Sequence, residues 1–112
     1  MRKLFLKDNN IIDIKVLEKV KFDKLEILDL NDNKISNINV LEKVNFKNLE
    51  KLYLKNNNIM NIRVLKNAKF EKLETLELSN NKISNINILE KVDFKNLKEL
   101  KGENKLTDIN IY

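Results

Sequence analysis

Residues 25–48 read LEILDLNDNKISNINVLEKVNFKN, and residues 73–96 repeat them almost unchanged as LETLELSNNKISNINILEKVDFKN. Leucine returns at a constant step of 24 residues, at Leu25, Leu49, Leu73 and Leu97. Self-similarity at a step of this length indicates a repeat array, in which each unit buries its apolar face against its neighbours. The place of a residue within the repeat therefore indicates its role.

Each repeat begins with a strand-like pattern and continues with a helix-like one. Apolar and polar residues alternate at residues 28–30, which is typical of a strand with one buried face. From residue 35 to 44 the apolar residues fall two to four positions apart, which favours a tight turn followed by a short helix. We expect Asn39 and Glu42 to form a capping box at the start of this helix. The same pair recurs at Asn87 and Glu90.

The first half of each repeat carries a family resemblance. LEILDLNDNKISNI resembles the leucine-rich repeat pattern LxxLxLxxNxIxxI, as do LEKLYLKNNNIMNI and LETLELSNNKISNI. Residues 3–14 form a partial first copy, so the resemblance extends over essentially the whole chain. It implies an α/β fold, a curved leucine-rich repeat solenoid with a parallel β-sheet on its concave face and short helices or turns on its convex face. Proteins of this family mostly bind other proteins, so the resemblance also implies a protein-binding module.

The repeat boundaries divide one domain, which we predict over residues 1–112. It consists of repeats 1–24, 25–48, 49–72 and 73–96 and a partial terminal repeat, 97–112. In the last repeat Asn104, Leu106 and Ile109 follow their counterparts by 23 rather than 24 residues. Charged residues and Gly102 near this shift predict a terminal strand protected against further strand addition. The first repeat begins in phase, without a capping element.

The composition removes the usual catalytic groups. The 112 residues include no Cys and no His, which excludes disulfides, thiolate metal sites and the commonest general base. The three serines therefore have no imidazole to activate them. Asp29 and Glu77 fall on non-adjacent strands, roughly 10 Å apart, which exceeds the separation that glycoside hydrolysis usually uses. We predict a protein that is not an enzyme, with no catalytic residues, no metal site and no cofactor.

The charges are spread along the chain. A net charge of +5 arises from 22 basic and 17 acidic residues, which indicates a solvated surface. No run approaches the roughly 18 apolar residues of a membrane span. Residues 1–8 contain no apolar stretch long enough for a secretory signal. Together with the absence of Cys, these features favour an intracellular protein with no membrane contact.

An asparagine recurs where the chain leaves each predicted strand. A buried amide is costly unless it is hydrogen-bonded, and asparagine can both donate to and accept from the turns of adjacent repeats. We therefore predict a structural asparagine ladder, formed by Asn9, Asn33, Asn57 and Asn81.

The positions between the buried leucines predict the residues of the concave surface. One column contains Phe5, Asp29, Tyr53, Glu77 and Lys101, and Lys51 and Lys55 flank its tyrosine. Exposed aromatic residues with a polar surround are typical of protein interfaces. We predict that the concave face binds a partner protein through Phe5, Asp29, Lys51, Tyr53, Lys55 and Glu77. Alternatively, unlike charges on adjacent repeats fix the register of the stack.

Two other functions compete with this prediction. The strand of the first repeat, residues 1–6, is an unprotected edge, so an engineered or excised repeat protein could form homo-oligomers through it. Binding of a nucleic acid or another acidic ligand ranks third. Four lysines and two aromatics could contact a phosphate backbone and bases, at Lys3, Phe5, Lys7, Lys51, Tyr53 and Lys55. However, Asp29 and Glu77 lie in the same strip and would repel phosphates.

Overall fold

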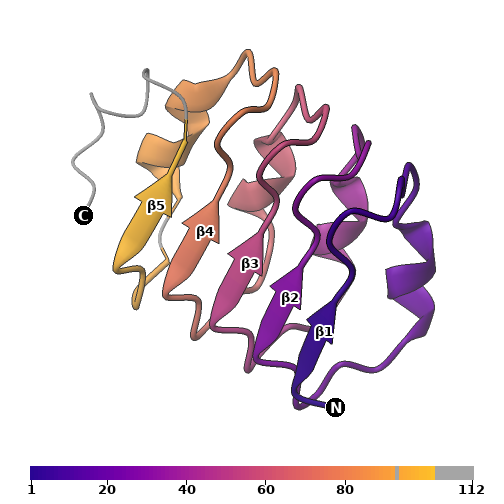
Figure 1. The fold of residues 1–112 in the computed structure, drawn as a ribbon. Helices are drawn as coiled ribbons and strands as arrows, with labels where there is room; N and C mark the ends of the chain where they lie inside the picture. Colours follow the sequence, from indigo (N-terminus) through magenta and orange to yellow (C-terminus); the bar gives the residue numbers. More distant parts are fainter. Residues whose placement is uncertain (93, 103–112) are drawn as a thin grey trace.

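A computed structural model describes residues 1–92 and 94–102 of the chain. Over these residues five short strands alternate with four 3₁₀ helices (Figure 1). The strands are β1 (Lys3–Phe5), β2 (Ile27–Asp29), β3 (Lys51–Tyr53), β4 (Thr75–Glu77) and β5 (Glu99–Lys101). The helices are η1 (Lys15–Lys19), η2 (Asn39–Glu42), η3 (Arg63–Lys66) and η4 (Ile86–Lys91).

The strands form one parallel sheet in chain order, β1-β2-β3-β4-β5. Neighbouring strands pair at the 24-residue step of the sequence, so that Leu28 aligns with Leu4 and with Leu52. In Figure 1 the sheet lies on one side of the molecule and the helices lie on the other. The chain is thus a curved solenoid with the sheet on its concave face, which confirms the predicted fold class.

The interior is built from columns of identical residue types. Leucines at the centre of the strands are fully buried at Leu28, Leu52 and Leu76. Between each helix and the next strand along the chain, phenylalanine rings follow one another from repeat to repeat, with ring centroids 5.7, 5.9 and 5.6 Å apart. These rings belong to Phe22, Phe46, Phe70 and Phe94. Such contacts stabilise the stack by about 0.5–1.5 kcal/mol per pair beyond the burial of the rings.

Asparagine and aspartate make the tight turns that follow the strands. Asp8, Asp32, Asn56 and Asn80 all have φ between 58° and 60°. This left-handed region favours glycine, but Asn and Asp tolerate it better than other residues because their short side chains bond to nearby backbone. The Asn56 amide donates to Asp32, and the Asn80 amide donates to Asn56. At these positions the same residue therefore both makes the turn and bonds to the turn of the neighbouring repeat.

The capping box predicted from the sequence is wrong. Asn39 is the first residue of η2, which has no side-chain cap hydrogen bond from its N-cap residue. Instead, the Asn39 N–H donates to Asn37 Oδ1 at 2.8 Å. Asp13 and Asn61 accept in the same way before η1 and η3. These Asx turns use an acceptor two residues earlier to bond the amide that begins the helix.

The second predicted capping box, Asn87 with Glu90, is wrong for a similar reason. Both residues lie inside η4, and its N-cap residue Asn85 makes no side-chain cap bond. Asn85 instead uses its amide to join repeats, donating to Asn61 Oδ1 at 2.9 Å.

Three charged residues, Lys98, Glu99 and Lys101, lie at the last strand of the described part of the sheet. Glu99 and Lys101 lie on β5, and the Lys98 ammonium lies 3.9 Å from the Glu74 carboxylate of the preceding repeat. Glu103 and the one-residue shift predicted at Asn104, Leu106 and Ile109 lie outside the described residues. Within residues 1–92 and 94–102, no helix is long and apolar enough to cross a membrane.

Candidate functional site

Pairing of the strands places five side chains in one row across the concave face. This row, called here the central row, contains Phe5, Asp29, Tyr53, Glu77 and Lys101. Each member follows a core leucine, so its side chain points away from the core toward the concave surface. Because adjacent strands lie roughly 4.8 Å apart, Phe5 and Tyr53 are about 10 Å apart with Asp29 between them.

Members of the central row differ in accessibility. Phe5 is 61% exposed, whereas Tyr53 and Asp29 are half-buried. Glu77 is only 8% exposed, because its carboxylate turns back and its Oε1 accepts the Ser79 N–H at 3.0 Å. A partner could therefore contact Phe5, Asp29 and Tyr53, but it would reach little of Glu77.

Asp29 also bonds to the backbone, but it retains exposed surface. Its Oδ1 accepts the Asn31 N–H at 3.0 Å, which fixes the carboxylate at the end of β2. The residues two positions before and after it, Ile27 and Asn31, carry no charge. The result is an oriented negative charge between two aromatic side chains.

Lysines lie two residues before and two residues after each aromatic residue of the central row. Lys51 is half-buried and Lys55 is exposed on either side of Tyr53, and Lys3 and Lys7 are exposed on either side of Phe5. Lys7 lies 3.8 Å from Asp32. Over the described ranges, no carboxylate lies within 4.0 Å of the ammonium groups of Lys51 and Lys55. These two ammonium groups can therefore meet a partner without breaking an ion pair.

Ion pairs between repeats lie outside the central row. Arg2 contacts Glu26 at 2.8 Å, and Lys98 contacts Glu74 at 3.9 Å. Exposed pairs of this kind typically contribute less than about 1 kcal/mol. These ion pairs, which lie beside the central row, support the alternative that unlike charges on adjacent repeats set the register of the stack. Within that row, Asp29 and Glu77 bond to backbone amides instead.

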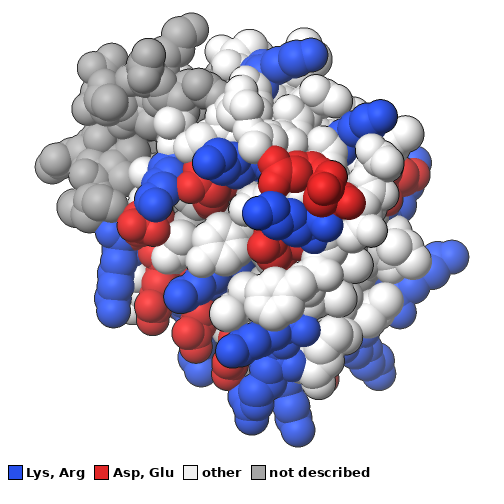
Figure 2. All heavy atoms as spheres, viewed as in Figure 1, with Lys and Arg blue, Asp and Glu red and all other residues white. Residues whose placement is uncertain are grey.

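Figure 2 shows the sheet side of the molecule with basic and acidic side chains interleaved and uncharged surface between them. A surface for a nucleic-acid backbone needs a continuous basic track. The mixed pattern instead favours a ligand that itself carries both charges and apolar groups.

The predicted asparagine ladder is confirmed. Asn33 Oδ1 accepts the N–H groups of Asn9 and Ile11, and its Nδ2 donates to the carbonyl oxygens of Leu6 and Leu30 at 3.0 Å. Asn57 and Asn81 bond their own neighbouring turns in the same way. Asn9 is exposed, and its amide donates to the Lys7 carbonyl oxygen at 3.1 Å. Asn33, Asn57 and Asn81 therefore join the loops of adjacent repeats, whereas the Asn9 side chain bonds within its own repeat.

Sequence reasoning missed two exposed valines of the first repeat. Val16 is 63% exposed, although its counterparts Val40 and Val64 are buried at 8% and 5%. Val20 is also exposed, whereas its counterpart Val44 is buried. The repeat pattern alone predicts the same burial in every copy. The difference arises because the described residues place no further repeat against this side of β1 and η1.

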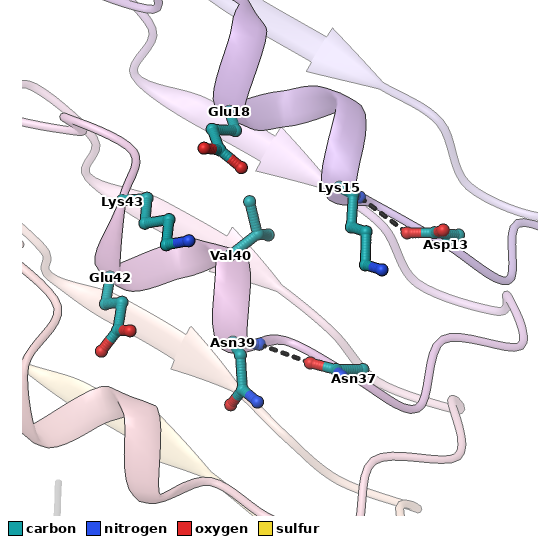
Figure 3. A pocket seen from close by; sticks show the side chains of 8 residues that line it. All are labelled: Asp13, Lys15, Glu18, Asn37, Asn39, Val40, Glu42 and Lys43. Atoms are coloured by element: carbon teal, nitrogen blue, oxygen red, sulfur yellow. Dashed lines mark hydrogen bonds between the residues drawn. The ribbon is translucent and has the colours of Figure 1, made fainter.

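A shallow polar pocket of about 290 Å³ lies on the convex side between η1 and η2 (Figure 3). Two of its acceptors, on Asp13 and Asn37, point to the first amides of the two helices, at Lys15 and Asn39. Its charged groups have both signs, on Lys15, Glu18, Glu42 and Lys43. In the part of the chain that the structure describes, no group of three or more acidic side chains could hold a metal ion.

Comparison with known proteins agrees with this architecture. A family model described as leucine-rich repeats in two copies matches residues 23–67 and 47–91. One similar solved structure is an internalin (inlF) from Listeria monocytogenes, with 27% identity and a TM-score of 0.73, covering 92% of this chain. Internalin C2 (inlC2) from the same species has 24% identity and a TM-score of 0.75, covering 91%. The chain spans 29% and 42% of the lengths of these two proteins. No curated protein sequence matches significantly.

Proposed function

Because the chain belongs to the leucine-rich repeat family, whose members generally bind proteins, we propose that it binds a partner protein through its concave face. The contact surface consists of the accessible part of the central row and the two lysines beside its tyrosine, namely Phe5, Asp29, Tyr53, Lys51 and Lys55. Glu77 contributes by holding the end of β4 rather than by touching the partner. In this proposal the chain has no catalytic role.

The main observation behind this proposal is that Phe5 is exposed and that Tyr53, two strands away in the same row, is accessible. Both aromatic rings lie on a wall whose other residues are mostly polar, and the lysines beside Tyr53 have no ion-pair partner among the described residues. Interface hot spots favour aromatic residues with a polar surround, since their burial releases water from a large apolar area. An exposed aromatic side chain has no comparable structural benefit for the chain by itself. The intracellular location expected from the sequence stays a prediction.

Site-specific photo-crosslinking tests which face of the solenoid meets the partner. A benzoylphenylalanine replaces either Tyr53 on the concave face or the exposed Lys66 on η3, and cells that express each variant are irradiated. We expect one protein to be captured from position 53 and not from position 66. The captured protein is then purified and its binding to the unmodified chain is measured. Capture from position 66 alone would contradict the proposal.

Self-association is a second candidate function, favoured by the exposed apolar residues of the first repeat. Val16, Val20 and Ile12 are exposed on the same repeat as the free edge of β1. Backbone groups of Lys3 and Phe5 that do not pair with β2 face this edge, and such an edge can pair with a strand of another chain. A second copy that covered this end of the solenoid would bury these side chains.

A further inference from the structure

We infer that the partner presents an amphipathic α-helix that lies across the strands of the concave face. Two apolar side chains seven residues apart contact Phe5 and Tyr53, and a Lys or Arg between them pairs with Asp29. This inference rests on the proposed function and specifies the chemistry of the partner at the same surface.

The spacing of the two aromatic residues is the first reason. Phe5 and Tyr53 occupy aligned positions on β1 and β3, two strand steps apart, which corresponds to roughly 9.6 Å. An α-helix rises about 1.5 Å per residue, so positions i and i+7 lie about 10.5 Å apart on the same face. Two helical turns therefore match two repeats of the solenoid.

An extended segment lying in the same direction does not match this spacing. Its residues are about 3.3 Å apart and alternate between its two faces. Side chains on one face are therefore about 6.6 or 13 Å apart. Neither value reaches both aromatic residues without strain or a bulge, whereas a regular helix does.

The position of Asp29 is the second reason. It lies one strand step from each aromatic residue, and helix positions i+3 and i+4 lie about 4.5–6 Å from the first anchor along the axis. A Lys or Arg at either position would reach the carboxylate, which the Asn31 amide already orients. The cation would also lie between two aromatic side chains, whose faces attract positive charge.

The lysines beside Tyr53 define the flanks of the bound helix. Lys51 and Lys55 lie two residues before and after Tyr53, so their ammonium groups are on opposite sides of an axis that crosses the strand. A helix with side chains is about 10–12 Å wide. Asp or Glu side chains on both flanks near the second anchor would therefore meet these lysines. The partner helix is apolar at its centre line, basic between the anchors and acidic at its edges.

Synthetic peptides test the inference with the protein as it is. The probe is a side-chain-bridged helix with leucines seven positions apart, an arginine four positions after the first leucine and glutamates on the flanks. Three matched peptides change one feature each. In the first, the second leucine lies five positions after the first leucine. In the second, glutamate replaces the arginine, and in the third, two D-amino acids prevent helix formation. Fluorescence anisotropy measures binding of each. We expect the probe to bind at least ten-fold more tightly than all three.

Variants of the protein separate this inference from the proposed function. We expect Tyr53→Ala or Phe5→Ala to weaken binding of the probe about ten-fold. Asp29→Asn should weaken the arginine peptide about five-fold and leave a version with neutral glutamine in place of arginine unchanged. The non-helical peptide could bind as tightly as the probe and with the same dependence on Tyr53. That result would contradict a helical partner but would remain consistent with binding at the concave face. If the probe did not bind up to millimolar concentration, or bound all variants equally, the inference would be overturned, while crosslinking at position 53 would still test the proposed function.

Discussion

Asn57 donates a hydrogen bond to the carbonyl oxygen of Leu30, 27 residues earlier in the chain and one repeat away, at 3.0 Å. The same amide donates to Leu54 within its own repeat, and its Oδ1 accepts the Ile35 N–H at 3.0 Å. Because Asn57 is only 6% exposed, water can hardly replace these bonds. One side chain thus bonds backbone groups in two repeats, and neither repeat satisfies those groups alone.

Asn57→Ala is expected to lower the free energy of unfolding by about 3 kcal/mol. The change leaves several buried backbone groups without partners, and each such group costs about 1–3 kcal/mol. Urea denaturation followed by circular dichroism measures the loss. Asn9→Ala is the matched control in an exposed position and should change the stability by less than about 0.5 kcal/mol. Equal losses in the two variants would contradict the assigned structural role of the ladder.

Phe46→Ala should cost about 3–5 kcal/mol, because the ring is fully buried and stacks on Phe22 and Phe70. Small domains are stable by only about 5–15 kcal/mol, so the midpoint of thermal unfolding should fall steeply. Phe5→Ala removes an identical ring from the concave surface and should leave the midpoint nearly unchanged. A comparable loss in both variants would mean that Phe5 is part of the core.

Glu77→Ala should reduce stability by about 1–2 kcal/mol, because it removes the acceptor of the Ser79 N–H from a buried position. Glu77→Gln keeps an acceptor oxygen and should recover most of the loss, which chemical denaturation would measure. Neither variant should alter the affinity for a partner. A large loss of affinity with unchanged stability would instead place Glu77 in the interface.

Self-association through the first repeat predicts a dimer that dissociates on dilution. Sedimentation equilibrium over a wide concentration range measures it. Val16→Asp should shift the equilibrium to monomer, because it places a charge in the apolar surface that a second copy would cover. Lys15→Asp introduces the same side chain at a neighbouring exposed position and serves as the control. A monomer at every concentration would contradict this second candidate function.

The 24-residue period is sufficient to predict the sheet, because the buried leucines and asparagines stack on their counterparts only when the strands pair at that step. Leu28 and Leu52 pair as the period requires, and Asn33 and Asn57 form the predicted ladder. The period does not specify which asparagine bonds to the first amide of each helix. Asn37 and Asn39 are the same residue type, and a pattern of a few apolar positions does not distinguish a short 3₁₀ helix from the start of an α-helix.

The candidate site was predictable in its placement but not in its accessibility. Alternation along the strands places Asp29 and Glu77 equally on the concave side, as the structure has them. The longer Glu77 side chain folds back onto the Ser79 amide and is buried, whereas Asp29 stays half-buried. Val16 shows the converse, since its exposure depends on what lies beside its repeat rather than on the repeat itself. Such differences follow from neighbouring side chains, which a column of the repeat does not specify.

The most direct test of the proposed binding surface is the affinity of the purified, crosslink-identified partner for Tyr53→Ala relative to the unmodified chain. Isothermal titration calorimetry gives both dissociation constants, and urea denaturation verifies that the variant keeps its stability. Arg63→Ala, an exposed change on the convex η3, is the matched control. We predict a dissociation constant at least about ten-fold higher for Tyr53→Ala, equivalent to about 1.4 kcal/mol or more, and no change for the control. Equal affinities of Tyr53→Ala and the unmodified chain would contradict binding through the central row.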